Sequence, residues 1–121
     1  MRMLLFAFTL LVLATGSRAE TRLLMLEEKW CEWCQLWDRE VGVVYHKTTE
    51  GKAAPLMRHD IRETLPDGVT LARRANYTPT FVLLQDGVEF GRIEGYPGED
   101  FFYGLLQKLL ETAAQKSGEG T

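Results

Sequence analysis

Two cysteines, Cys31 and Cys34, are the residues of this chain best suited to chemistry. They are its only cysteines, three positions apart in Trp30-Cys31-Glu32-Trp33-Cys34. Thiols at this spacing can form a disulfide and pass it to another molecule by exchange. The pair follows a short apolar run, Leu23–Leu26, and precedes Gln35–Tyr45, where apolar residues recur every three or four positions. We therefore expect a strand, then the cysteines, then a helix.

Three other uses of a cysteine pair compete with exchange. A structural disulfide closing four residues would contribute only ~1.9 kcal/mol, against ~3 kcal/mol for a 15-residue loop. Zinc would need two more ligands, and the only histidines, His46 and His59, lack the close spacing of structural zinc sites. Attachment of c-type haem requires a histidine after the second cysteine, where Gln35 stands. Redox exchange is favoured, haem is excluded, and we expect neither a cofactor nor a metal.

The roles of the two thiols follow from their expected positions. Cys31 should lie at the helix N-terminus, where unpaired N–H groups and the helix dipole lower the pKa of a thiol. It is the predicted nucleophile. Cys34, one turn into the helix, should be more shielded, and it is the predicted resolving thiol that releases the partner from the mixed disulfide.

The first nineteen residues have the pattern of a secretory signal peptide. Arg2 precedes eleven uncharged residues, Leu4–Ala14, and Ser17-Arg18-Ala19 places small residues one and three positions before a cut after Ala19. An uncleaved anchor is the alternative, but eleven residues fall well short of the ~20 that span a bilayer. We expect residues 1–19 to be removed and residues 20–121 to form one exported domain, without stable membrane insertion.

Charge and size limit the classes of partner and fold. Without residues 1–19 the formal net charge moves from −3 to −5, and no basic cluster remains. Nucleic acid is therefore not an expected partner. About 100 residues suffice for one hydrophobic core, and we expect a monomer.

The order of elements predicts an α/β fold. A strand, a crossover helix and a strand imply a parallel pair, and a hairpin adds antiparallel strands. The product is a mixed four-stranded sheet flanked by helices. The expected elements are a strand at Thr21–Leu26, a helix at Gln35–Tyr45, a polar loop at His46–Ala54, a strand at Leu56–Ile61, a short helix at Val69–Ala75, a strand at Phe81–Leu84, a turn at Gln85–Gly87, a strand at Val88–Glu94 and a helix from Glu99.

A family resemblance rests on the cysteine segment together with Thr78-Pro79-Thr80, in this order of elements. Over Thr21–Lys116 the chain resembles the thioredoxin superfamily, without its usual extra N-terminal strand and helix. The resemblance implies a thioredoxin-like fold in which Pro79 is cis and lies against the cysteines. It also implies that Thr78 offers its backbone to an extended segment of the partner.

A narrower resemblance rests on Trp37–Gly42, Glu50–Leu56 and Arg92–Phe102. These segments resemble SoxS-like periplasmic thioredoxins of bacterial sulfur-oxidation clusters. That family implies a periplasmic protein that keeps a partner thiol reduced, namely the cysteine of the sulfur-carrier protein. It also implies a membrane thiol transporter as the electron donor.

Two departures from the thioredoxin pattern leave the direction of electron flow open. Glu32-Trp33 replaces Gly-Pro between the cysteines, and a carboxylate beside Cys31 disfavours its thiolate. Met25 stands where thioredoxins carry a buried Asp. A disulfide oxidant or isomerase, and a redox-inactive binding module, remain alternatives to a reductase.

Some aromatic residues are further candidates for partner binding. Trp30 and Trp33 would either form an apolar surface for the partner or pack partly into the core. The thioredoxin fold implies that the loop around Tyr96 lies near the site, so we expect Tyr96 to contact the partner. The complete set of candidate partner-binding residues is Trp30, Trp33, Thr78, Pro79 and Tyr96.

Overall fold

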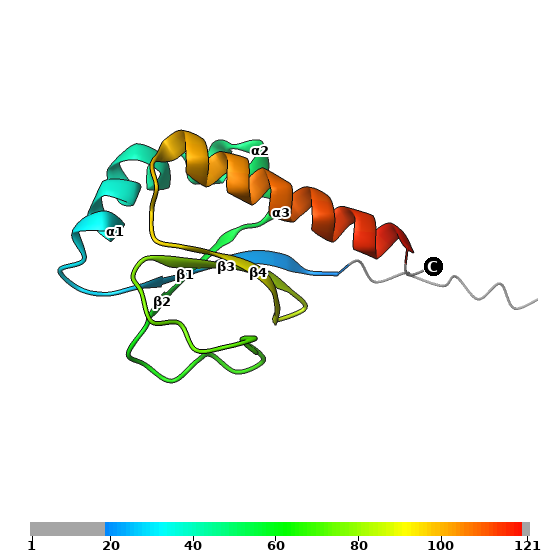
Figure 1. Ribbon diagram of the computed structural model, residues 1–121, viewed down its shortest axis with the longest axis horizontal. Coiled ribbons are helices and arrows are strands. Elements are labelled where there is room, and N and C mark those ends of the chain that lie inside the picture. The colour runs from blue at the N-terminus through cyan, green and yellow to red at the C-terminus, as the bar shows by residue number, and fades with distance from the viewer. Residues whose placement is uncertain (1–18, 120–121) are drawn as a thin grey trace, which may run out of the picture.

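The computed structural model describes residues 19–119 (Figure 1). The predicted signal peptide, except for Ala19, lies outside these residues. The elements in chain order are β1 (Thr21–Glu27), α1 (Glu32–Trp37), the π-helical turn η1 (Asp38–Gly42), the 3₁₀ turn η2 (Tyr45–Lys47), α2 (Thr49–Ala53), β2 (Leu56–Asp60), β3 (Thr80–Gln85), β4 (Val88–Glu94) and α3 (Glu99–Glu119).

The four strands form one mixed sheet in the order β2-β1-β3-β4, which confirms the predicted architecture. β1 is parallel to β2 and antiparallel to β3, and β3 is antiparallel to β4. The predicted hairpin between β3 and β4 turns at Asp86 and Gly87, whose φ angles are 51° and 81°. Thr80 pairs with Leu26 and with Glu94, so the end of β1, the start of β3 and the end of β4 meet at one edge. We call this the redox edge.

All helices lie on one face of the sheet, where they bury an aromatic core (Figure 1). The ring of Trp37 lies 5.1 Å from that of Phe81 and 5.8 Å from that of Phe102, and the latter two are 4.8 Å apart. Such tilted and edge-to-face contacts add stability beyond the area that the rings bury. Trp37 is fully buried at the centre of this core. Cys34 of α1 belongs to the same core, so α1 packs directly on that core.

The opposite face of the sheet carries a second core, covered by a loop rather than a helix. This covering loop, residues 61–79, runs from the end of β2 to the start of β3. Its apolar side chains pack on Leu24, Leu26, Val82 and Leu84 of the sheet; they are those of Ile61, Leu65, Val69, Leu71 and Ala75. The predicted helix at Val69–Ala75 is therefore wrong.

At Thr70 the backbone of the covering loop pairs with the hairpin turn and the start of β4 rather than forming helical bonds. Thr70 forms a bridge to Val88, with its N–H donating to the Gly87 carbonyl at 2.8 Å. Its carbonyl accepts from the N–H of Glu89 at 2.9 Å. Val69 and Leu71 both face the second core, and side chains two positions apart share a face in extended chain but not in a helix.

Two further expectations about helices need correction. The predicted helix at Gln35–Tyr45 is α-helical only to Trp37 and then widens into η1. The predicted polar loop at His46–Ala54 contains α2, where the Thr48 Oγ1 caps the helix by accepting from the N–H of Gly51 at 2.9 Å. Within residues 19–119, no helix combines the length and apolar character needed to cross a membrane.

Candidate active site

Cys31 and Cys34 form a disulfide at the start of α1, with their Cα atoms 5.2 Å apart. Cys31 is the N-cap of the helix, and its Sγ accepts a hydrogen bond from the N–H of Cys34 at 3.1 Å. Cys31 is partly exposed, whereas Cys34 is only 3 % exposed. The two sulfur atoms are thus unequal, because a molecule from outside can approach only the first.

A sharp turn brings the chain from β1 into the disulfide. The N–H of Cys31 donates to the carbonyl of Glu28 at 3.2 Å, and Trp30 adopts a φ angle of 72°. A residue with a Cβ atom rarely occupies this left-handed region, and such residues cluster at functional sites. The turn lifts the Trp30 side chain clear of the core and aims Cys31 at solvent.

Trp30 and Trp33 lie on the surface and not in the core. Their exposed fractions are 80 % and 59 %, and the Lys29 Nζ lies 5.3 Å from the Trp30 ring centroid. Exposed apolar side chains that lie together are typical of surfaces that meet another molecule. Both side chains therefore lie on the surface beside the disulfide and do not pack into the core.

Pro79 lies at the redox edge, directly before the first residue of β3. The peptide bond from Thr78 to Pro79 is cis, as the family resemblance implied. The Pro79 carbonyl accepts from the N–H of Gly95 at 2.7 Å, and the Thr80 hydroxyl donates to the Tyr77 carbonyl at 2.5 Å. The first bond ties Pro79 to the residue after β4, and the second closes the turn that precedes β3.

Tyr96 has a different place from the one expected. Its side chain is 6 % exposed, packs on Phe102 at 6.3 Å and donates from its hydroxyl to the Glu40 Oε1 at 2.8 Å. Burial, reinforced by the bond to Glu40, raises the pKa of this hydroxyl above its ordinary value. The expectation of direct contact with a partner therefore does not fit the structure. Tyr96 links the start of α3 to η1.

Met25, where the family resemblance implied a buried Asp in other members, is fully buried in β1. Two residues further along β1, Glu27 accepts from Arg58 of β2 at 2.5 and 3.1 Å. The same guanidinium donates to Asp38, at the end of α1, at 2.7 and 3.0 Å. The bonds to Glu27, followed by those to Asp38, raise the pKa of Arg58. Arg58 thus links β1, β2 and the end of α1, and its positive charge offsets the negative charges of Glu27 and Asp38.

An ion pair that was not predicted from the sequence lies in β4, where it joins the sheet to the covering loop. Glu89 and Arg92 of β4 have side chains only 4 % exposed, with the Arg92 Nη2 2.6 Å from the Glu89 Oε1. Arg92 also donates to the carbonyls of Arg73 and Arg74 in the covering loop. The signal in the sequence was that the strand Val88–Glu94 carries charged residues, Glu89 and Arg92, on a face that should be apolar. Across the described part of the chain, no group of three or more His, Cys, Asp or Glu could hold a metal ion.

No family model matches the chain, and neither does any curated protein. Among solved structures, the crystal structure of the periplasmic thioredoxin SoxS from Paracoccus pantotrophus, in its reduced form, matches with a TM-score of 0.76. The identity is 51 %, and the match covers 78 % of this chain and 99 % of that chain. With a thioredoxin fold and a Cys-x-x-Cys disulfide at its redox edge, the chain belongs to the SoxS-like thioredoxins and is a thiol–disulfide oxidoreductase.

Proposed function

We propose that this protein works in the periplasm as a reductase of one partner protein, with Cys31 as nucleophile and Cys34 as resolving thiol. The observation that carries the proposal is the unequal exposure of the two sulfur-bearing residues at the start of α1. A partner sulfur can reach Cys31, whereas Cys34 is buried in the core. The SoxS match, a periplasmic thioredoxin, supports the compartment.

The reaction needs both cysteines in the reduced form. The Cys31 thiolate attacks a sulfur of the partner's disulfide, which forms a mixed disulfide and releases the other sulfur as a thiolate that takes up a proton. The Cys34 thiolate then attacks the Cys31 sulfur, so that the partner leaves as a thiol. The N–H of Cys34, 3.1 Å from the Cys31 Sγ in the disulfide, is placed to stabilise negative charge on that sulfur.

Four residues would receive the partner. Trp30 and Trp33 offer the exposed apolar surface, and the backbone of Thr78 beside the cis Pro79 pairs with an extended segment of the partner. We propose that the partner is the sulfur-carrier protein of a sulfur-oxidation system and that a membrane thiol transporter supplies the electrons. Cleavage after Ala19 would leave a soluble, monomeric domain of residues 20–121.

Alkylation and trapping test the two roles. The reduced protein should react with iodoacetamide first at Cys31, as read by peptide mass spectrometry. Cys34→Ser should accumulate a mixed disulfide with the partner in periplasmic extract, and Cys31→Ser should form none. Exchange retained in Cys31→Ser, or faster alkylation of Cys34, would overturn the assignment.

A redox titration against glutathione tests the direction of electron flow. A reductase should have a potential well below the roughly −180 mV of protein disulfide isomerase. A value near or above that figure would instead identify an oxidant or isomerase of protein disulfides using the same two cysteines.

A further inference from the structure

The covering loop borders an open cavity beside the redox edge. The cavity volume is about 830 Å³. Its wall at the redox edge includes Leu26, Glu28 and Thr78, the residue before the cis proline. Nineteen residues without regular structure are unusual in a compact domain, and such loops often serve binding. The cavity is therefore a candidate to hold the part of a partner that flanks its reacting cysteine.

The loop is held rigidly where it borders the cavity. Arg92 donates to the Arg73 carbonyl at 2.7 Å and to the Arg74 carbonyl at 3.3 Å, while Glu89 accepts from the N–H of Ala72 at 3.3 Å. A nearly fully buried ion pair thus fixes three consecutive loop residues by their backbones. These bonds use only the backbone of the loop, so they leave the Arg73 and Arg74 side chains available for other contacts.

The charged residues that line the cavity differ in whether they already have partners. Arg62 contacts Asp60 at 3.3 Å and Glu28 at 3.6 Å, and Arg73 contacts Glu94 at 2.9 Å. Glu63 also lines the cavity and adds a negative charge.

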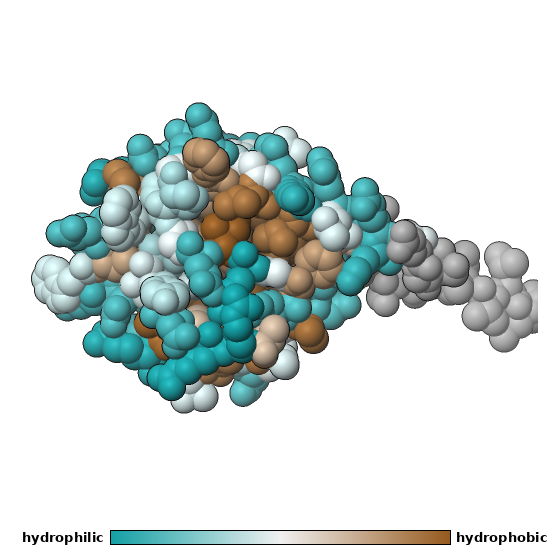
Figure 2. Space-filling model, in the orientation of Figure 1, coloured by the Kyte–Doolittle hydropathy of each residue, from teal (hydrophilic) through white to brown (hydrophobic). Residues whose placement is uncertain are grey.

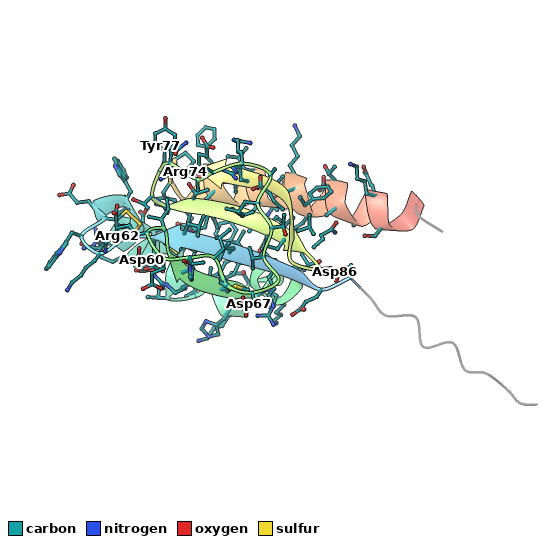
Figure 3. The ribbon with its side chains drawn as sticks, turned by 90° about the horizontal axis from the view of Figure 1, so that it is seen from below. Asp60, Arg62, Asp67, Arg74, Tyr77 and Asp86 are labelled. Carbon is teal, nitrogen blue, oxygen red and sulfur yellow. A yellow bond between two sulfur atoms is a disulfide. The ribbon has the colours of Figure 1, made fainter. Side chains whose placement is uncertain are left out.

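Arg74 is different. Within residues 19–119 its guanidinium has no hydrogen bond or ion pair, and its side chain is exposed. Figure 3 shows Arg74 and Tyr77 on the loop toward the same end of the molecule as Arg62, with Asp67 and Asp86 toward the other end. Tyr77, which precedes Thr78, is 63 % exposed. An unpaired guanidinium on a fixed backbone, next to an exposed aromatic ring, is suited to a carboxylate, which arginine binds in a planar, two-point fashion.

We propose that Arg74 selects partners by binding an acidic side chain in the extended segment that flanks the partner's cysteine. The apolar floor of the cavity, including Leu26, Ile61 and Leu65, takes a neighbouring apolar side chain. This inference rests on the proposed function, since it concerns how the same disulfide meets its partner. It adds a specificity residue outside the Cys-x-x-Cys segment and the cis proline.

Synthetic peptides test the proposal without the natural partner. Each peptide has one cysteine in a disulfide with mercaptoethanol, and a Glu, Gln or Lys placed two, four or six positions from that cysteine. The reduced protein converts each to the peptide thiol and free mercaptoethanol, while its own dithiol becomes the disulfide. At low salt and at the best spacing, the Glu peptide should react about 5-fold faster than the Gln peptide, the factor expected of one exposed charge pair.

Charge reversal supplies the decisive comparison. Arg74→Glu should reverse the preference, so that the Lys peptide reacts faster than the Glu peptide. Because each ratio is measured within one variant, it does not depend on how much of that variant is folded. Lys52→Glu makes the same change of charge on α2, beyond the other end of β2, and should keep the wild-type preference.

The outcomes separate the two proposals. Equal rates for all peptides with the wild type, or an unchanged preference in Arg74→Glu, would overturn the role of Arg74 and leave the reductase intact. No reaction of the wild type with any peptide would overturn both. A preference that persists unchanged in 1 M salt would also count against Arg74, since an exposed charge pair is screened there.

Discussion

The buried ion pair of β4 makes a sharp prediction about stability. Arg92→Met should destabilise the protein more than the loss of a surface contact would, because it leaves the Glu89 carboxyl, only 4 % exposed, without its charged partner. The same change leaves the carbonyls of Arg73 and Arg74 without their donor.

The expected loss can be worked out from these contacts. Breaking a buried pair by removing one member costs about 3–5 kcal/mol, which is a large part of the ~5–15 kcal/mol that stabilises a domain. The melting temperature should fall by roughly 10 °C or more. Replacing both members, Glu89→Met with Arg92→Met, removes the unpaired charge and should recover about 2 kcal/mol relative to the sum of the single changes.

Urea unfolding of the oxidised protein measures these free energies. Arg73→Met is the matched control, because its pair with Glu94 is exposed and should contribute less than about 1 kcal/mol. A loss below about 1 kcal/mol in Arg92→Met would refute the reasoning, as would strictly additive effects of the two replacements. Limited proteolysis should cut the covering loop faster in Arg92→Met than in the wild type.

Four further substitutions concern the helical face. Gly51→Ala should cost about 1–3 kcal/mol in urea unfolding, because a Cβ there would collide with the backbone carbonyl of Tyr45. The Tyr45 hydroxyl donates to the Ala54 carbonyl at 2.6 Å, and burial raises its pKa in the folded protein. Above about pH 10 the unfolded chain therefore loses this proton before the folded protein does. The free energy of unfolding should then fall by about 1.4 kcal/mol per pH unit. Tyr45→Phe should reduce the fall of stability with pH in thermal melts between pH 9 and 11. An unchanged dependence on pH would argue against this role of Tyr45. Tyr96→Phe should cost about 0.5–1.5 kcal/mol by removing the bond to Glu40, and Glu40→Gln should cost less because the amide still accepts.

The sheet could be predicted because its signals are local. Leu23–Leu26 and Phe81–Leu84 are apolar at every position, and both strands are indeed buried on both faces, with alternate residues in the two cores. The turn at Asp86-Gly87 follows from the residues that tolerate positive φ. Strand order then follows from the crossover and the hairpin.

The covering loop could not be predicted because its partners are distant in sequence. Val69 and Leu71 look like part of a short helix, but Glu89 and Arg92, about 20 positions later, supply the polar groups that an extended backbone needs. The helix α2 could have been predicted, since Thr48 is a favourable N-cap residue and Pro55 marks where the helix must end.

Part of the candidate site could likewise be predicted from local signals, and part of it could not. The cysteine motif and Thr78-Pro79 carry local and family information, so their positions and the cis bond were anticipated. Whether an aromatic residue lies inside or outside depends on the whole fold. Trp30 is therefore exposed and Tyr96 buried, although both stand in short segments rich in turn-forming or polar residues.

Figure 2 shows how mixed the surface is, with apolar side chains gathered in the middle of one face and polar ones around them. Against this background the three tryptophans form an optical reporter that needs no label. Trp30 and Trp33 stand in solvent beside the disulfide, and Trp37 is sealed in the core with Cys34. Acrylamide should quench the fluorescence of the first two and spare the third. Shielding of the quenchable fraction would then signal that a partner covers the disulfide, before any sulfur has been exchanged.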